Sequence, residues 1–285
     1  MTLFAFCLVL VSAVFHAGWN FLARKVTGDY VVMWLAQLAA LVIFFPPALF
    51  VICFGDFHFA DSGTGVLCMI ASGLVHSLYF FLLARAYQQG EISVVYPIAR
   101  GSGIGLTALL AAFFLQETIS QRGAMGIGFI FVGILFFCGL QVRSLATEPG
   151  VGRALWVGVT IVGYSLVDKI GVAGLHPVVY LWGMTALAAL PFGLFVCTAC
   201  RGRIRATLTL QWPAVALIGL GSGGTYLMIL FAFQLDLVSY IVALREFSVV
   251  IGAAMGFSIF KERLTRQKVV GMVAITLGLL LIKAA

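Results

Sequence analysis

The sequence predicts an all-α integral membrane protein with ten transmembrane helices as two inverted five-helix repeats. Three observations support this fold class. First, 62% of the 285 residues are hydrophobic and only 9% are charged, whereas ordinary soluble domains contain about 25% charged residues. Second, long apolar stretches recur from one end of the chain to the other. Third, the two halves of the sequence share one pattern of glycines and charges. This composition excludes a soluble globular domain.

Five helices are predicted in the first half of the chain. Each is bounded by charges, Gly/Pro pairs or polar clusters, and a helix needs roughly 20 residues to cross a bilayer. The run from Tyr30 to Gly55 is the clearest, since it contains no charged side chain. The first run has no positively charged leader and is too long for a signal-peptide core, so we expect it to remain as a mature helix. In chain order these helices are predicted at residues 2–23, 30–54, 64–87, 92–115 and 123–142.

Five further helices are predicted in the second half from the same kinds of break. The residues from Ile170 to Cys200 contain no charged side chain, which again exceeds the length of one membrane crossing. The connections are short and neither end of the sequence has room for a soluble domain, so we expect the function to reside inside the helical bundle. These helices are predicted at residues 152–168, 177–200, 210–235, 237–260 and 268–283.

A shift of 145 residues aligns the two halves of the chain and predicts an internal duplication. The two repeats are residues 1–145 and residues 146–285. Because each repeat holds an odd number of helices, the second copy must enter the membrane from the opposite side, which makes the repeat an inverted one. The aligned pairs are Gly18 and Gly163, Trp19 and Tyr164, Asn20 and Ser165, Arg24 and Lys169, Arg100 and Arg245, Glu117 and Glu262, Gly126 and Gly271, and Gly133 and Gly278.

The distribution of Lys and Arg predicts the orientation of the chain. The loops after the odd-numbered helices hold 12 of the 17 basic residues, the opposite loops hold three, and Arg100 and Arg245 lie inside helices. Cytoplasmic loops are enriched in positive charge, so we expect both termini outside the cytoplasm in a bacterial inner (plasma) membrane, with a cytoplasmic loop at residues 201–205. The net charge of +7 favours lipid headgroups of the bilayer over nucleic acid, because the basic residues form no extended face.

Two segments of the sequence resemble a known family. The stretch from Ala243 to Gly252, which contains Arg245 and Glu246, is followed by Phe260 to Arg263 and then by Gly271 and Gly278; its counterpart runs from Tyr96 to Arg100 and continues with Glu117 and Gly126. This pattern resembles an EamA-type transporter of the drug/metabolite transporter (DMT) superfamily. The resemblance covers essentially the whole chain. It implies a secondary transporter, often an exporter of amino acids or other small metabolites, with a central cavity between two inverted five-helix repeats.

Arg100 and Arg245 are the clearest candidates for a functional site. Each lies about eight residues into its helix, or roughly 12 Å, and the two helices start from opposite faces of a core about 30 Å thick. Both guanidinium groups are therefore expected near the midplane, where a charge costs about 2.5–3.5 kcal/mol without a partner, a wet cavity or a function. One interpretation is that one or both bind a substrate carboxylate or phosphate. The other is that they hold helix ends or broken backbone by bonding carbonyl groups.

Glu246 breaks the repeat symmetry, because its counterpart in the first half is Gly101. It points about 100° away from Arg245 around the helix, but it could reach Arg100 across the interface. We interpret it either as a protonatable coupling residue, which makes protons a candidate coupling ion, or as the charge partner of an arginine. Two arginines and one glutamate leave the midplane at +1, which favours an anionic or zwitterionic solute over a cation.

Weaker candidates form polar stripes at helical spacing, which face the bundle interior as hydrogen-bonded contacts between helices or as cavity wall. The stripes are Ser12, His16, Trp19 and Asn20; Ser72, His76 and Tyr79; Thr160, Tyr164 and Asp168; and Ser222 and Tyr226. Trp19 and Tyr164 are interpreted as aromatic gates, with an interfacial aromatic belt as the alternative. The predicted substrate-binding residues are Trp19, Asn20, His76, Tyr79, Tyr96, Arg100, Tyr164, Ser222, Tyr226 and Arg245, with Glu246 as the coupling residue.

Glycines and cysteines are interpreted as packing residues. Three G-x-x-x-G spacings, at residues 101–105, 219–223 and 252–256, predict close helix crossings. The six cysteines lie within or at the edge of apolar runs and are interpreted as small buried hydrophobic residues. No metal site and no cofactor are predicted from them.

These features predict a secondary transporter that moves a small polar metabolite by alternating access, with export as the expected direction. The solute is expected to be an amino acid, an organic acid or a similar anionic or zwitterionic molecule, and the protein is expected to be a monomer or a homodimer. A passive channel, a structural membrane subunit and a cationic drug exporter are alternatives. An intramembrane enzyme is a further one, although the sequence has no H-E-x-x-H and no G-x-S-G nucleophile motif.

Overall fold

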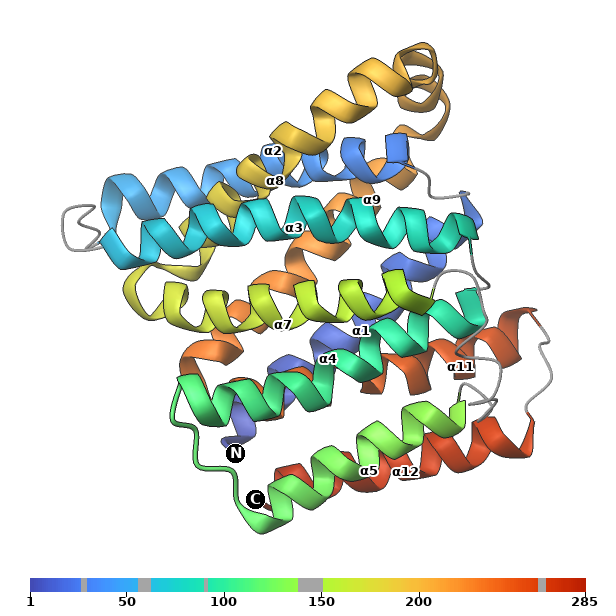
Figure 1. Cartoon of the computed structure of the whole chain (residues 1–285). Coiled ribbons are helices and arrows are strands. Elements are labelled where there is room, and N and C mark those ends of the chain that lie inside the picture. The colour runs from blue at the N-terminus through green and yellow to red at the C-terminus, as the bar shows by residue number, and fades with distance from the viewer. Residues whose placement is uncertain (27–29, 56–62, 90–91, 138–150, 261–264) are drawn as a thin grey trace.

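Long α-helices dominate the computed structural model, which describes residues 1–26, 30–55, 63–89, 92–137, 151–260 and 265–285 (Figure 1). Helices suit these apolar runs because backbone groups in lipid need partners within their own segment. The helices of the described residues are α1 (Leu3–Lys25), α2 (Tyr30–Phe54), α3 (Gly63–Gln89), α4 (Ile92–Phe114), α5 (Gln121–Phe137), α7 (Val151–Gly174), α8 (Pro177–Ala199), α9 (Arg201–Leu235), α10 (Val238–Leu244), α11 (Phe247–Phe260) and α12 (Arg266–Lys283). Each of them overlaps a helix predicted from the sequence, which confirms the all-α fold class.

The prediction of a loop at residues 201–205 was wrong, because α9 already begins at Arg201. The stretch contains no proline before Pro213, and arginine, alanine and leucine favour helix. The Thr209 hydroxyl also donates to the Arg205 carbonyl at 3.0 Å, one turn earlier. With 35 residues the helix is roughly 52 Å long, so its first turns extend beyond a hydrocarbon core of about 30 Å.

The helix predicted at residues 237–260 is interrupted at Arg245 and Glu246, which separate α10 from α11. At the break the Glu246 amide donates to the Ala243 carbonyl and the Ser248 amide to the Arg245 carbonyl, both at 3.1 Å. These bonds span three residues, as in a 3₁₀-turn, instead of the four of an α-helix. The two charged residues of this span therefore lie at a discontinuity of the helix.

Several helices are long and apolar enough to cross a membrane. Within the described residues, seven stretches meet that requirement by length and composition: Leu3–Ala23, Tyr30–Phe54, Gly63–Leu83, Gly152–Gly174, Pro177–Ala199, Arg201–Leu235 and Val238–Ile259. Two shorter apolar helices cover Ile98–Phe114 and Gln121–Phe136.

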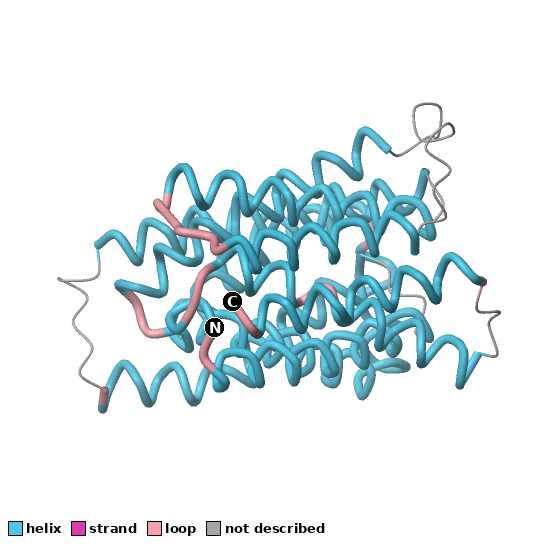
Figure 2. The backbone as a smooth tube through the Cα atoms, turned by 90° about the horizontal axis from the view of Figure 1, so that it is seen from below, coloured by secondary structure: helices cyan, strands magenta, loops and turns pink. Residues whose placement is uncertain are grey.

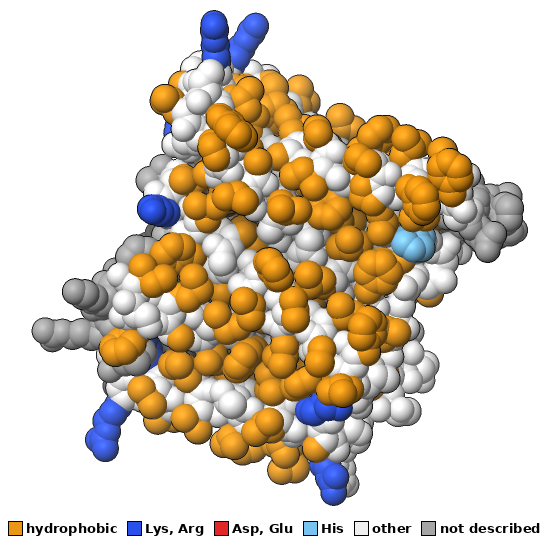
Figure 3. All heavy atoms as spheres, turned by 180° about the vertical axis from the view of Figure 1, so that it is seen from behind, with side chains coloured by type: hydrophobic (Ala, Val, Ile, Leu, Met, Phe, Trp, Pro, Cys, Tyr) orange, Lys and Arg blue, Asp and Glu red, His pale blue; other side chains and the backbone are white. Residues whose placement is uncertain are grey.

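The outer surface of the bundle is apolar. Large hydrophobic side chains such as Leu210, Phe54 and Val42 are more than 70% exposed, which water would penalise and lipid does not. Hydrophobic side chains cover the face in Figure 3, and Lys and Arg project near its edges. The surface is that of an integral membrane protein. The interpretation of the cysteines as buried residues was wrong for Cys7, Cys53 and Cys197, which are exposed on this surface.

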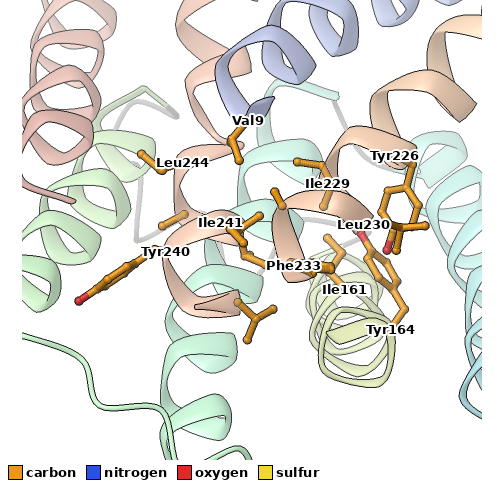
Figure 4. Close-up of a cluster of buried hydrophobic side chains, with 14 of the residues drawn as sticks. Val9, Ile161, Tyr164, Tyr226, Ile229, Leu230, Phe233, Tyr240, Ile241 and Leu244 are labelled. Carbon is orange, nitrogen blue, oxygen red and sulfur yellow. The ribbon is translucent and has the colours of Figure 1, made fainter. Parts of the chain in front are cut away.

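Helices from the two halves of the chain pack against each other throughout the bundle. α1 packs on α9, α3 on α7 and α8, α2 on α8 and α9, and α4 on α7. α5 and α12 lie side by side at one end of the molecule (Figure 1). The buried hydrophobic cluster in Figure 4 joins α1, α7, α9 and α10, with Tyr164 and Tyr226 beside each other at one edge. The two termini also lie close together (Figure 2), and Lys283 donates to the Met1 carbonyl at 3.3 Å.

Glycines permit the closest helix crossings. A methyl group added at Gly126 would lie 2.8 Å from the Gly278 carbonyl oxygen, and one added at Gly133 would lie 2.8 Å from the Gly271 carbonyl oxygen. Between α9 and α2, a methyl group at Gly219 would lie 2.5 Å from the Ala36 carbonyl oxygen, and one at Gly223 would meet the Phe44 ring at 2.4 Å. The G-x-x-x-G spacing at residues 219–223 therefore marks a close crossing, as predicted. The same prediction was wrong at Gly105 and Gly252, where an added methyl group would meet nothing within 4 Å.

Candidate functional site

A cavity lies between α1, α2, α3, α8 and α9, and Arg100, Tyr164 and Arg245 complete its wall. About 120 Å³ is open to the centres of water molecules, against roughly 10–15 Å³ for one buried water. A small metabolite therefore fits. Small residues of α2, α8 and α9, among them Ala36, Ala40, Ala188 and Gly223, form part of the wall and leave this space.

Most of the predicted substrate-binding residues meet at this cavity. Those that line it are Trp19, His76, Tyr79, Arg100, Tyr164, Ser222, Tyr226 and Arg245. Asn20 is not one of the lining residues, and its side-chain amide donates to the His16 carbonyl of its own helix at 2.7 Å. The Tyr96 side chain lies outside the described residues. Glu246 is not part of the lining and contacts Arg100 instead.

Arg100 and Glu246 form a buried ion pair between α4 and the break that follows α10. The Arg100 Nη2 atom lies 2.6 Å from Glu246 Oε1, and Nε donates to Oε2 at 3.1 Å. The two side chains are only 7% and 3% exposed. This is a bidentate contact in which each charge compensates the other. It favours the interpretation of Glu246 as the charge partner of an arginine.

Arg245 has a different environment. It is 8% exposed, lines the cavity, and its guanidinium carbon lies 5.4 Å from the centroid of the Tyr226 ring. In the part of the chain that the structure describes, no carboxylate forms an ion pair with it. A cation–π contact contributes about 0.5–2 kcal/mol, which is less than the cost of about 2.5–3.5 kcal/mol for a charge in hydrocarbon. The positive charge of Arg245 is thus only partly compensated and faces the cavity.

Asp168 organises the polar contacts behind Tyr226. It is fully buried, Tyr180 donates to its Oδ1 atom at 2.8 Å, and the Tyr226 hydroxyl donates to Oδ2. Each carboxylate oxygen thus accepts a tyrosine hydroxyl, and Tyr226 connects Asp168 with Arg245. Hydrogen bonding to a carboxylate increases the electron density of that ring, which strengthens its attraction for the guanidinium above it.

Aromatic rings form one wall of the cavity. The His76 ring stacks on Tyr164 with a centroid separation of 4.2 Å, and the Tyr79 and Tyr226 rings pack edge-on against Tyr164 at 5.8 and 6.1 Å. His76 also shares a hydrogen bond with Ser72 at 3.1 Å. The stripes predicted on α3 and α7 thus face each other across the bundle interior. The wall is held by contacts on several helices.

Four polar residues of the cavity are absent from the predicted substrate-binding set: His16, Gln37, Thr185 and Thr225. Gln37 and Thr225 line it from α2 and α9 and are 8% and 3% exposed. The available signal for Gln37 is its isolation, since it is the one residue with a side-chain amide, carboxyl or hydroxyl group between Val31 and Phe54. A pattern of polar residues at helical spacing does not include Gln37, because no polar residue lies one helical turn away from it.

Other buried charges hold helix ends at a distance from the cavity. Glu117 accepts hydrogen bonds from the Val238 and Ser239 amides at 2.6 and 3.2 Å and from the Ser239 hydroxyl at 2.6 Å, so it caps the start of α10. Lys169 donates to the carbonyls of Phe233 and Asp236 at the end of α9. Among the described residues, no group of three or more His, Cys, Asp or Glu side chains could hold a metal ion.

An apolar helical bundle around a central cavity that carries arginine and aromatic residues defines a membrane transporter. The model of the EamA-like transporter family matches residues 3–139 and 149–284. The chain belongs to this family, and it is a membrane transporter of the drug/metabolite type.

Two further likenesses are consistent with this membership. A solved structure titled "Crystal structure of protein" has a TM-score of 0.71 with 16% sequence identity and covers 99% of this chain and 97% of its own, which shows a shared fold. A protein named "Uncharacterized protein y4nH" from Sinorhizobium fredii (strain NBRC 101917 / NGR234) is 31% identical over 72 residues, or 24% of this chain. The match spans 62% of the length of that protein.

Proposed function

We propose that this transporter moves a small anionic or zwitterionic metabolite through the central cavity by alternating access. The observation that carries the proposal is Arg245, a buried arginine that faces the cavity with a cation–π contact and no ion pair among the described residues. A planar guanidinium binds a carboxylate with two parallel hydrogen bonds. A substrate carboxylate would supply the missing compensation, whereas a cationic drug would be repelled.

The contacts between helices support a two-fold inverted repeat, an arrangement that many alternating-access transporters share. Under the 145-residue shift, α1 and α9 correspond to α7 and α3, and both pairs are in contact. The contact of Gly126 with Gly278 corresponds to that of Gly271 with Gly133. We therefore propose that residues 1–145 and 146–285 are two repeats of five spans, with α10 and α11 as one interrupted span. The excess of Lys and Arg on one side, 12 against three, supports the further proposal that both termini lie outside the cytoplasm of a bacterial inner membrane. Export is proposed from the family resemblance.

The test is a thermal-shift screen of the purified full-length protein against amino acids, organic acids, phosphorylated metabolites and cationic drugs, because a ligand of the native state stabilises by RT ln(1 + [L]/Kd). We expect stabilisation by carboxylates, its loss in Arg245→Lys and Arg245→Gln, and its retention in Arg205→Lys, a control at an exposed arginine. Lys is expected to fail because it lacks the bidentate geometry. Stabilisation by cations alone would reject the anion site.

Transport of the best ligand in liposomes then distinguishes a transporter from a channel. A carrier with one central site shows saturable counterflow of labelled solute against its unlabelled form. Arg245→Lys and Arg245→Gln should both abolish this counterflow. A linear leak without counterflow would favour a passive channel.

A further inference from the structure

Three residues of the cavity wall carry buried polar side-chain atoms that have no hydrogen-bond partner among the described residues. Both side-chain amide atoms of Gln37, the Trp19 indole nitrogen and the Thr225 hydroxyl are buried and unpaired. All three residues line the cavity. A buried polar group left unsatisfied costs about 1–3 kcal/mol, and the large majority of such groups in proteins are paired. Three neighbouring helices that each contribute one indicate a site for something polar.

Glycines of α9 hold these side chains in place. A methyl group at Gly219 would lie 2.5 Å from the carbonyl oxygen of Ala36, the residue before Gln37, and one at Gly221 would lie 2.8 Å from the Trp19 Cβ atom. The α9 backbone therefore packs in direct contact with α2 and α1. The Ser12 hydroxyl also donates to the Thr225 carbonyl at 3.1 Å, which ties α1 to α9 beside the site. The unpaired atoms sit on a preorganised framework, which lowers the entropic cost of binding.

The chemistry of these atoms selects the group that they can bind. The Gln37 amide offers two donors and one acceptor, the Trp19 nitrogen is a donor only, and the Thr225 hydroxyl can do both. A carboxylate has no proton for the Gln37 oxygen, and an ammonium has no acceptor for Trp19. A neutral carboxamide has two donors and two acceptor lone pairs and can pair with all four atoms, and a hydroxyl, with one donor and two lone pairs, can pair with three of them.

We propose that Gln37, Trp19 and Thr225 form an uncharged subsite that recognises a carboxamide or hydroxyl group of the solute. The assignment rests on the proposed function, in which Arg245 binds the carboxylate of the same molecule. The solute class is then a small carboxylic acid that carries one neutral hydrogen-bonding group. Dicarboxylates are discriminated against, because their second charge would be desolvated against the Gln37 oxygen.

Succinate and its monoamide succinamate test this specificity, since they share one carbon skeleton and differ in a single terminal group. We expect succinamate to bind wild-type protein at least about tenfold more tightly, the factor that corresponds to one buried hydrogen bond. Gln37→Met, which keeps the side-chain volume, should remove that preference and retain binding of both acids. Arg245→Gln should weaken both acids together.

A second measurement decides the role of Gln37 without any ligand. If its amide serves only a solute, Gln37→Met replaces an unpaired polar group by an apolar one, and the Tm should stay unchanged or rise. The matched control is Gln234→Met, which removes an amide that donates to the Val172 carbonyl at 2.6 Å and should lower the Tm. A fall in Tm for Gln37→Met as large as that for Gln234→Met would overturn the subsite, whatever the probes do.

The outcomes separate the two proposals. Equal binding of succinate and succinamate by wild type, or a preference that survives in Gln37→Met, would reject the subsite and leave the Arg245 site intact. Binding that ignores Arg245→Gln would reject the carboxylate site instead. A preference that depends on Gln37 together with binding that depends on Arg245 supports both.

Discussion

Replacing Glu246 with glutamine should strongly destabilise the protein. The substitution removes the charge and keeps the shape, so the buried Arg100 guanidinium loses the Glu246 carboxylate that it contacts at 2.6 and 3.1 Å. Breaking a buried pair in this way costs about 3–5 kcal/mol, or roughly a hundred- to several-thousand-fold in the unfolding equilibrium. An exposed pair would contribute at most about 1 kcal/mol. The two side chains are 7% and 3% exposed, so the larger figure applies.

Thermal unfolding of the purified protein measures this loss, and a double-mutant cycle with Arg100→Met isolates the energy of the pair. The double variant Arg100→Met/Glu246→Gln should be more stable than Glu246→Gln alone, because the positive charge that Glu246 compensated is removed as well. Arg205→Lys, at an exposed arginine, should change the free energy of unfolding by less than about 0.5 kcal/mol. A Glu246→Gln variant with the wild-type Tm would refute the reasoning. If that variant also kept counterflow and lost transport driven by a pH gradient, Glu246 would be the coupling residue.

Three further predictions concern the helices around the site. Arg203→Cys in a cysteine-free background should react with an impermeant thiol reagent only from the cytoplasmic side, and labelling from outside would reverse the proposed orientation. Gly278→Ala should lower the Tm, because the added methyl group would lie 2.5 Å from the Gly126 carbonyl oxygen. Gly128→Ala, with nothing within 4 Å, should leave the free energy of unfolding unchanged or raise it by up to about 1 kcal/mol; equal effects of the two substitutions would contradict the close crossing. Partial burial lowers the pKa of His176, whose neutral Nδ1 atom accepts the Val178 amide at the start of α8. The contribution of His176 to stability is complete above the pKa of about 6.5 that it has in the unfolded chain, and it is lost as the pH falls through the lower pKa of the folded state. The Tm of the wild type should therefore fall more on acidification than that of His176→Asn. Parallel pH profiles of Tm would exclude this capping role of His176.

Much of the helical architecture could be predicted from local sequence, and the exceptions have physical reasons. Apolar runs between charges located each helix, because membrane burial depends mainly on composition. The break at Arg245 and Glu246 could not be predicted, since no proline or glycine marks it and it depends on contacts with α4 and α9. The helical first turns of α9 were missed because charge was interpreted as a sign of a loop.

The candidate site was predictable where polar residues lie in pairs along one helix. His76 and Tyr164 were found because each belongs to a stripe with helical spacing, and both line the cavity. The contact of Arg100 with Glu246 followed from geometry, because the two residues come from helices expected to meet. Gln37 escaped notice because its importance arises from the approach of α9, a contact between residues far apart in the sequence.

At the break between α10 and α11, two consecutive residues make different contacts. Arg245 faces the cavity above Tyr226, while Glu246 is fastened to Arg100 on α4. One peptide plane joins the two, and peptide planes are rigid. A backbone rotation at this junction that moves Arg245 toward an anion would therefore also displace Glu246. By thermodynamic linkage such a dependence is mutual. If anion binding at Arg245 weakens the ion pair of Glu246 with Arg100, then weakening the ion pair changes the anion affinity at Arg245 by the same factor.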